Sequence, residues 1–202
     1  MANSSSRGRP RASSKAMLED AAFDLFVEQS YAGTTVEQIA QRAGVSRNTF
    51  FNYFDSKSDV FWVFLDERLE ALGPALDATD RSTPVMTALY DAVLEVGAGF
   101  GPGRVPWALT QTELIGSVHE LQASALARLS RQAAIVTDFV ADRVPHPLPV
   151  LLARAVAYSV IGAAVAAVQS WASAGTTRGD LAPYLAEALA PIRDGYAPVL
   201  AA

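Results

Sequence analysis

The sequence has no cysteine and only two histidines among its 202 residues. A chain without thiols forms no disulfides, binds no metal through thiolates and has no cysteine nucleophile. His119 and His146 lie far apart, in no spacing typical of metal ligands. A Gly-rich phosphate loop and a motif that pairs a nucleophile with a base are also missing. We therefore expect no metal and no cofactor. An enzyme stays a rival hypothesis, which steady turnover of a ligand by the purified protein would support.

An excess of positive charge is missing too, since the net charge is −5. Its distribution is more informative than its sum. Residues 1–60 carry seven basic and seven acidic side chains, so the remaining 142 residues account for the whole deficit. Arg7, Arg9, Arg11 and Lys15 precede the first acidic residue. A basic arm on a neutral head, followed by an acidic body, suits a protein that contacts a polyanion with one end only.

The N-terminal arm, residues 1–13, is basic and Ser-rich, and we expect it to be flexible. It does not continue into the apolar stretch of a secretory signal, so we expect a cytoplasmic protein. The arginines of such an arm either follow a DNA backbone and enter a minor groove, or they only keep the protein soluble. The sequence leaves both roles open.

Apolar residues recur with helical spacing along the chain, and no segment alternates convincingly with the period of a strand, so we predict an all-α fold. This pattern predicts a first helix over residues 14–29. Thr35, with Gln38 three residues later, has the spacing of a capping box. We therefore expect a short second helix to begin directly after Thr35.

The next signals predict a turn and a third helix. Gly44 lies where a tight turn between two helices needs a glycine. Ser46 is a suitable N-cap for a third helix that ends near Tyr53 or Phe54. Three short helices, the last two joined by a few residues around glycine, predict a helix-turn-helix domain over residues 14–56.

Longer helices are expected in the body, residues 57–202. The fourth should end at Gly73-Pro74, because glycine and proline terminate helices. The helices predicted for the body cover residues 57–72, 83–96, 106–143 with a break near 116–117, 150–174 and 180–193. The segment 150–174 is long and apolar enough to span a membrane. Since it is Ala-rich and lacks a basic flank, we favour a helix buried in a core and a subunit interface, with no membrane partner.

The third helix presents two different faces when each residue is turned by 100°. Phe50 and Phe54 point inward, whereas Asn48 and Asn52 point outward, and Thr49 and Phe51 flank them. Asparagine can pair with adenine through two hydrogen bonds, and an apolar ring or a Thr methyl can pack on the thymine methyl. This face therefore predicts a helix that reads bases in the major groove. The alternative is that Phe51 packs on a neighbouring helix and the asparagines are ordinary surface.

Contacts to phosphate are expected around this helix. Arg47, at its start, is placed to read guanine or to hold a phosphate. Thr35, Tyr53 and Lys57 are further candidates for the backbone. Arg42 is either another phosphate contact or a solvated charge.

The stretch TTVEQIAQRAGVSRNTFFNYFDSKSDVF, residues 34–61, closely resembles the DNA-binding domain of the TetR family of bacterial regulators. The resemblance implies an all-helical homodimer paired through its last two helices, which binds a double-stranded DNA operator. It also implies an effector-binding and dimerisation domain over residues 57–202, in which a small molecule usually releases the repressor from DNA. The family's phosphate-contacting positions fall on Thr35, Phe51, Tyr53 and Lys57. A tyrosine hydroxyl is common where this chain has Phe51, which cannot supply that hydroxyl to a phosphate, and an apolar contact to a base is the alternative role there.

Two shorter pieces, FFNYFDSKSDVFW and WASAGTTRGDLAPYLAEAL, resemble the actinobacterial subgroup that includes the mycofactocin-associated regulators. This resemblance implies an acyl-coenzyme A type of effector. The scarcity of basic clusters in the body favours an apolar effector instead. A helical dimer that has lost specific DNA binding is the other alternative, and the outward asparagines speak against it.

Candidate effector-binding residues are the polar and aromatic side chains on otherwise apolar stretches of the body. For each of them, an ordinary place in the core or in an interface is the alternative reading. The candidates are Tyr90, Trp107, His119, Arg128, Tyr158, Gln169 and Trp171.

Overall fold

The computed structural model describes residues 11–102, 105–144 and 148–201. Every element in these ranges is a helix, which confirms the predicted all-α fold. The chain divides into two compact units, Met1–Val63 and Phe64–Ala202. Residues 1–10 of the predicted arm lie outside the described residues, whereas residues 11–13 already belong to the first helix, which begins earlier than predicted.

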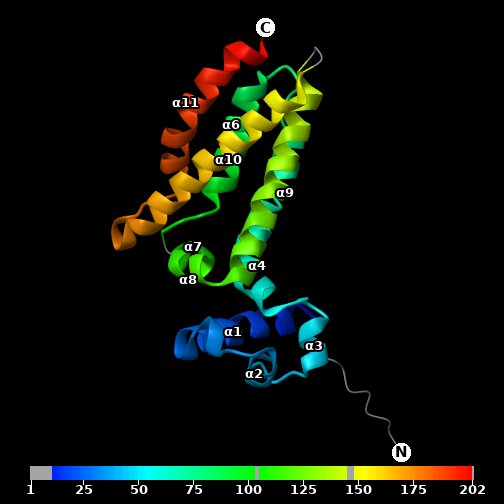
Figure 1. The fold of residues 1–202 in the computed structure, drawn as a ribbon, viewed down its shortest axis with the longest axis vertical. Helices are drawn as coiled ribbons and strands as arrows, with labels where there is room; N and C mark the ends of the chain where they lie inside the picture. The colour runs from blue at the N-terminus through cyan, green and yellow to red at the C-terminus, as the bar shows by residue number, and fades with distance from the viewer. Residues whose placement is uncertain (1–10, 103–104, 145–147, 202) are drawn as a thin grey trace, which may run out of the picture. The chain divides into compact units, whose positions relative to one another are not determined.

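The N-terminal unit contains three helices and the start of a fourth. These are α1 (Arg11–Gly33), α2 (Val36–Arg42), α3 (Arg47–Phe51) and α4 (Lys57–Leu69) (Figure 1). The predicted caps are confirmed: the Thr35 hydroxyl accepts from the Gln38 N–H in a complete capping box, and the Ser46 hydroxyl accepts from the Thr49 N–H. Gly44 has a φ of +68°, so the turn between α2 and α3 uses the left-handed conformation that glycine adopts without strain.

The C-terminal end of α1 is kinked at the residue where the sequence predicts its end. Gln29 and Ser30 leave the helical conformation, and Ser30 has φ of 68° and ψ of 165°, a region that is almost restricted to glycine. The hydroxyl of the buried Thr34 is a donor within reach of two carbonyl oxygens, that of Ser30 at 2.8 Å and that of Leu25 at 3.2 Å. Thr34 therefore holds a strained turn, while its neighbour Thr35 caps the next helix.

Replacing Ser30 by glycine is expected to stabilise the protein. Glycine removes the steric cost of this conformation, about 1–3 kcal/mol, against a loss of about 0.5–1 kcal/mol for its extra freedom in the unfolded chain. We expect Ser30→Gly to raise the Tm by about 2–4 °C, measured by calorimetry. Ser30→Ala is the control, because it keeps the strain and loses the hydroxyl. A fall in Tm for Ser30→Gly equal to that of Ser30→Ala would contradict this explanation.

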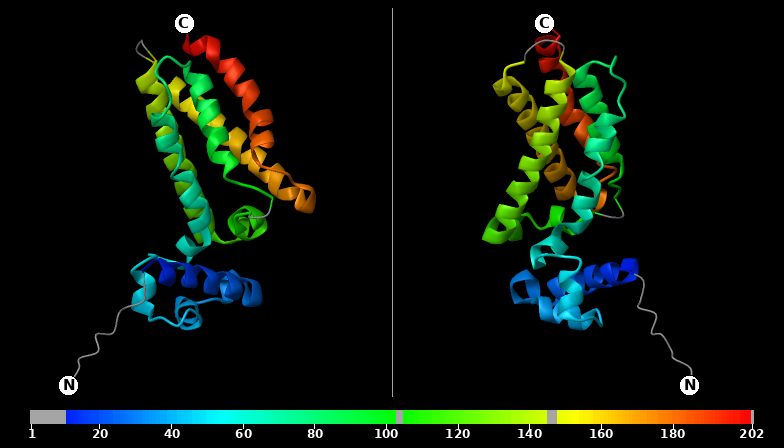
Figure 2. Two further views of the ribbon diagram at one scale, coloured as in Figure 1. Left: turned by 180° about the vertical axis from the view of Figure 1, so that it is seen from behind. Right: turned by 90° about the vertical axis from the view of Figure 1, so that its right-hand side faces the viewer.

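The C-terminal unit contains the remaining helices, and α11 packs against both α6 and α10 (Figures 1 and 2). The helices that follow α4 are α5 (Leu72–Asp77), α6 (Val85–Ala98), α7 (Trp107–Thr110), α8 (Thr112–Ser117), α9 (His119–Arg143), α10 (Val150–Ser173) and α11 (Ala182–Leu200), with a 3₁₀ turn at Gly175–Thr177. The core of this unit is lined by residues such as Leu89, Val136, Val156 and Leu185, all at most 3 % exposed.

Two predicted helix ends are wrong. Helix α4 ends at Leu69, and Gly73-Pro74 lies within the first turn of α5 instead of terminating α4. Proline is tolerated there because the first N–H groups of a helix have no intrahelical partner. The last helix continues past residue 193 to Leu200, with Pro191 and Pro198 inside it.

Helix α10 is long and apolar enough to cross a membrane, with a mean hydropathy of 1.9, and it is the one such helix among the described residues. A single helix of this kind is weak evidence for a membrane span, since core helices of soluble proteins also qualify. In this fold α10 packs on α9 and α11. Ala153, Val156 and Ala157 on its inner face are at most 1 % exposed.

Candidate nucleic-acid interface

Helix α3 has the two faces that its sequence predicts. Phe50 is fully buried and Phe54 is 5 % exposed, so these rings anchor the helix to its unit. Asn48 and Asn52 on the other face are exposed. Phe51 is 41 % exposed, although its ring edge contacts Phe50 with centroids 5.4 Å apart. The helix therefore presents two amides and an apolar ring on a rigid aromatic base.

Arg47 at the start of α3 has a partner that the sequence analysis missed. Its Nε lies 2.6 Å from Oε1 of Glu37, at the start of α2, and both side chains are about 60 % exposed. The guanidinium carbon also lies 5.1 Å from the centre of the Phe51 ring. Glu37 thus pairs with the arginine beside the exposed Phe51 on α3.

Lys57 has a structural role within the N-terminal unit. Its Nζ donates to the carbonyl oxygens of Tyr31, at 2.7 Å, and Thr34, at 2.9 Å. The ammonium also lies 4.0 Å from the centre of the Tyr31 ring. These contacts fasten the start of α4 to the kinked end of α1. An ammonium group has three donors, so a phosphate contact by Lys57 remains compatible with them.

The other phosphate candidates differ in their surroundings. Thr35 is exposed, and its hydroxyl accepts a bond in the capping box, which leaves it able to donate. Thr49 is half-buried and its hydroxyl lies 2.9 Å from that of Ser46. Tyr53 is also half-buried. Arg42 is hydrogen-bonded to Glu28 on α1, and this bond lowers the pKa of the Glu28 carboxyl below its ordinary value.

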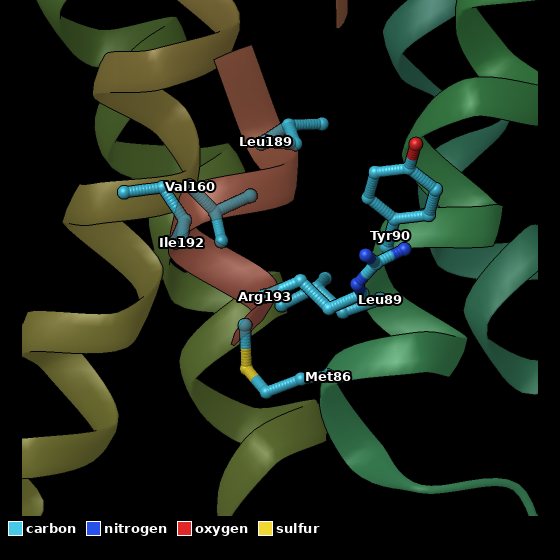
Figure 3. A pocket seen from close by; sticks show the side chains of 7 residues that line it. All are labelled: Met86, Leu89, Tyr90, Val160, Leu189, Ile192 and Arg193. Carbon is cyan, nitrogen blue, oxygen red and sulfur yellow. The ribbon is translucent and has the colours of Figure 1, made fainter. Parts of the chain in front are cut away.

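In the C-terminal unit, Tyr90 lines a small gap enclosed by α6, α10 and α11 (Figure 3). The volume of the gap is about 10 Å³, which is close to the least that a single water needs. The Arg193 guanidinium lies 4.6 Å from the centre of the Tyr90 ring. Tyr90 is half-buried beside this gap, which has room for about one water.

Trp171 is fully buried, and its indole Nε1 donates to the Gly179 carbonyl oxygen at 2.8 Å. Its ring packs edge-on against Phe100, with centroids 6.4 Å apart. Tyr158 on the same helix is 57 % exposed. His119, the first residue of α9, and Gln169 are exposed, whereas Trp107, the first residue of α7, is half-buried. The candidates thus lie on several helices and in different degrees of burial.

Arg128 forms a two-pronged ion pair with Asp66, which the sequence analysis also missed. Its Nε and Nη2 donate to the two carboxylate oxygens at 2.7 and 2.6 Å, and its Nη1 donates to the Ser124 carbonyl oxygen at 3.1 Å. The side chains are only 13 % and 27 % exposed. Asp66 lies on α4, so Arg128 links α9 to the helix that begins at Lys57.

Metal-ligating side chains do not gather anywhere in the described ranges: no group of three or more His, Asp or Glu residues could hold an ion there. Two buried or paired groups on α9, Gln132 and Arg128, border a groove against α4 and α5. No sequence signal marked Gln132, since a buried glutamine in a helix resembles a surface one until the fold is known.

A short helix that exposes asparagines over a buried aromatic base, preceded by a tight turn from a capped helix, defines a helix-turn-helix DNA-binding protein. Its second unit is an all-helical body. The model of the tetR family of bacterial regulatory proteins matches residues 18–62, and the MftR C-terminal domain model matches residues 83–197, more than half of the chain. The chain belongs to the TetR family of DNA-binding transcriptional regulators and has a C-terminal domain of the MftR type. Both resemblances stated from the sequence are confirmed.

Similar proteins cover most of the chain. A relative from Mycobacterium tuberculosis, named for MftR and mycofactocin biosynthesis, is 27 % identical over 85 % of this chain and 86 % of its own. The crystal structure of FadR from Bacillus subtilis with stearoyl-CoA is similar with a TM-score of 0.60 and 22 % identity, over 89 % of this chain and 98 % of that one. FadR from Thermus thermophilus with lauroyl-CoA has a TM-score of 0.57 and 20 % identity, over 90 % and 94 %. These structural likenesses establish the fold.

Proposed function

We propose that this regulator is a homodimeric, cytoplasmic repressor that binds a two-fold symmetric operator and leaves it when a small molecule binds the body. The exposed face of α3, with Asn48 and Asn52 outward over Phe50, is the observation that supports base reading. Asn48, Thr49, Phe51 and Asn52 are proposed to contact bases, and the remaining proposed DNA contacts are Thr35, Arg47, Tyr53 and Lys57. The proposed activity is the regulation of transcription, without a catalytic step.

The outer faces of the last two long helices support the proposed dimer. Leu151 and Tyr158 on α10 are 80 % and 57 % exposed, and Val199 on α11 is 46 % exposed. Large exposed apolar side chains on neighbouring helices are typical of an interface between subunits. We therefore assign Tyr158 to the dimer interface in preference to an effector site.

The test of this function is a selection of genomic DNA fragments by the purified full-length protein. We expect recovered fragments to share two related half-sites whose centres lie about one helical turn, roughly 10 bp, or a multiple of it apart. Fragments without a shared sequence would support the rival hypothesis of a helical dimer that has lost specific DNA binding.

The effector is proposed to be a largely apolar small molecule. FadR from two bacteria was crystallised with acyl-CoA. Stearoyl-CoA and the free fatty acid are therefore among the molecules to be tested for release of the protein from the selected operator. Two arginines of the body already have partners, which argues against a phosphate-rich effector. Arg128 pairs with Asp66, and Arg143 donates to the carbonyl oxygens of Thr79, Asp80 and Thr83.

Removing the charge of Glu37 is expected to strengthen operator binding. The Glu37–Arg47 pair is exposed, so separating it costs at most about 1 kcal/mol, and its loss frees a cation beside the base-reading face. Glu37→Gln should raise the affinity about two- to fivefold, measured by fluorescence anisotropy at several salt concentrations. Glu28→Gln is the matched control, since it also removes one negative charge from a pair with an exposed arginine, but that arginine, Arg42, lies outside α3 and keeps Asp24 as a partner. Weaker binding of Glu37→Gln would mean that Glu37 positions Arg47 on the DNA and does not withhold it.

A further inference from the structure

A groove lies between α4–α5 on one side and α9 on the other, entirely within the C-terminal unit. Its volume is about 290 Å³, near the lower end of the range for small-molecule sites in proteins. The apolar part of its lining is formed by Leu69 and Pro74 on one side and by Ile135 on the other. The groove is therefore large enough for a small organic molecule, unlike the gap beside Tyr90.

Gln132 in this groove carries an unsatisfied polar atom. Its side chain is 93 % buried, given an exposure of 7 %, and its Oε1 is buried without a hydrogen-bond partner in the structure. Leaving an acceptor buried and unpaired destabilises a fold, and native proteins contain few such groups. Its neighbour Ala133 and Val136 on the same helix are fully apolar and at most 2 % exposed. An apolar side chain would suit this position better unless the amide serves a ligand.

The charges around the groove limit what it can hold. Arg128 is neutralised by Asp66 at 2.6 Å, and Arg131 faces the groove together with the carboxylate of Glu70. Two acidic and two basic side chains thus line it, and the more buried basic one is already paired. A strong anion would find no uncompensated buried cation, whereas an N–H or O–H donor would satisfy Gln132.

We propose that this groove is a binding site for an uncharged organic molecule with an apolar body and an amide or hydroxyl donor, which bonds to Gln132 Oε1. The ligand contacts Leu69 and borders Asp66, both on α4, the helix that begins at Lys57. The effect of the ligand on DNA binding rests on the proposed function, whereas the binding of the ligand to the groove does not. In this proposal the effector is an uncharged molecule with a hydrogen-bond donor, and the helix on which it acts is α4.

The first test is the stability of Gln132→Leu. Because leucine removes the unpaired acceptor, we expect the Tm to rise by about 3–6 °C. A glutamine with a purely structural hydrogen bond would give a fall in Tm instead. Gln122→Leu on the exposed face of the same helix is the control, and its Tm should change by about 1 °C at most. A fall in Tm for Gln132→Leu would overturn the proposal.

The second test uses the absence of cysteine from the chain. A Cβ added at Gly73, on the groove, meets no atom within 4 Å, and the same holds at Gly179, away from the groove. The full-length Gly73→Cys and Gly179→Cys variants are each exposed to small disulfide fragments ending in a primary amide, an alcohol, a plain phenyl ring or a carboxylate. Capture is measured by mass spectrometry under partly reducing conditions.

We expect the amide and alcohol fragments to be captured by Gly73→Cys roughly tenfold more than the phenyl fragment, as one hydrogen bond to a buried acceptor allows, and the carboxylate least. Gly179→Cys should not discriminate, and adding Gln132→Leu to Gly73→Cys should abolish the preference. Equal capture of all four fragments at both positions would overturn the proposal. Since no DNA is present, selective capture together with a failed operator selection would refute only the proposed function.

Discussion

Asn52→Ala is expected to weaken binding to the selected operator by about 1–3 kcal/mol, which is roughly 5- to 150-fold. Asn52 lies exposed at the C-terminal end of α3, on the face opposite to the buried Phe50. The variant lacks the amide that is proposed to form the bidentate contact to adenine. The measurement is a titration of labelled operator followed by fluorescence anisotropy, with random-sequence DNA as the reference. Binding to random DNA should change little, since phosphate contacts dominate it.

A modified base gives the control for this prediction. An operator with 7-deazaadenine at the contacted position lacks the N7 acceptor, so it should weaken the unmodified protein but leave Asn52→Ala unaffected. The Tm of the variant should also stay within about 1–2 °C, because an exposed polar substitution changes stability by at most about 0.5 kcal/mol. If Asn52→Ala lowers binding to operator and to random DNA equally, Asn52 does not read a base.

Much of the N-terminal unit could be predicted from sequence because its signals are local. A capping box needs residues only three apart, as with Thr35 and Gln38, and a left-handed turn needs one glycine, Gly44. The inward direction of Phe50 follows from helical spacing alone. The same reasoning failed at Gly73-Pro74, because proline both ends helices and fits their first turn, and only the surrounding packing decides between these roles.

The features that the sequence did not reveal depend on residues far apart in the chain. Asp66 and Arg128 are 62 residues apart, and nothing near either of them indicates a partner. Gln132 gains its significance only from burial. The effector candidates were chosen by residue type, yet Trp171 is 0 % exposed and Tyr158 is 57 % exposed, so residue type alone could not identify a pocket.

Lys57→Ala is expected to impair folding as well as DNA binding. The family resemblance assigns Lys57 to a phosphate, yet in the structure its ammonium donates to the carbonyl oxygens of Tyr31 and Thr34. Hydrogen bonds to charged groups contribute about 1.5–3 kcal/mol each, and the variant leaves both carbonyls without this donor. We expect the free energy of unfolding to fall by about 2–3 kcal/mol, measured by urea denaturation, and operator binding to weaken as well.

Arg42→Ala is the matched control for Lys57→Ala, since it removes one positive charge from the same unit and the ion pairs it breaks, with Glu28 and Asp24, are both exposed. Its effect on unfolding should be within about 1 kcal/mol. If Lys57 only contacted phosphate, Lys57→Ala would leave the free energy of unfolding unchanged. It would reduce the salt dependence of DNA binding by about the amount of one phosphate contact. Lys57 in this structure should change both quantities, because the bonds that fasten α4 to the end of α1 also fix the ammonium in place. Unchanged stability of Lys57→Ala would show that these two hydrogen bonds contribute nothing to the fold.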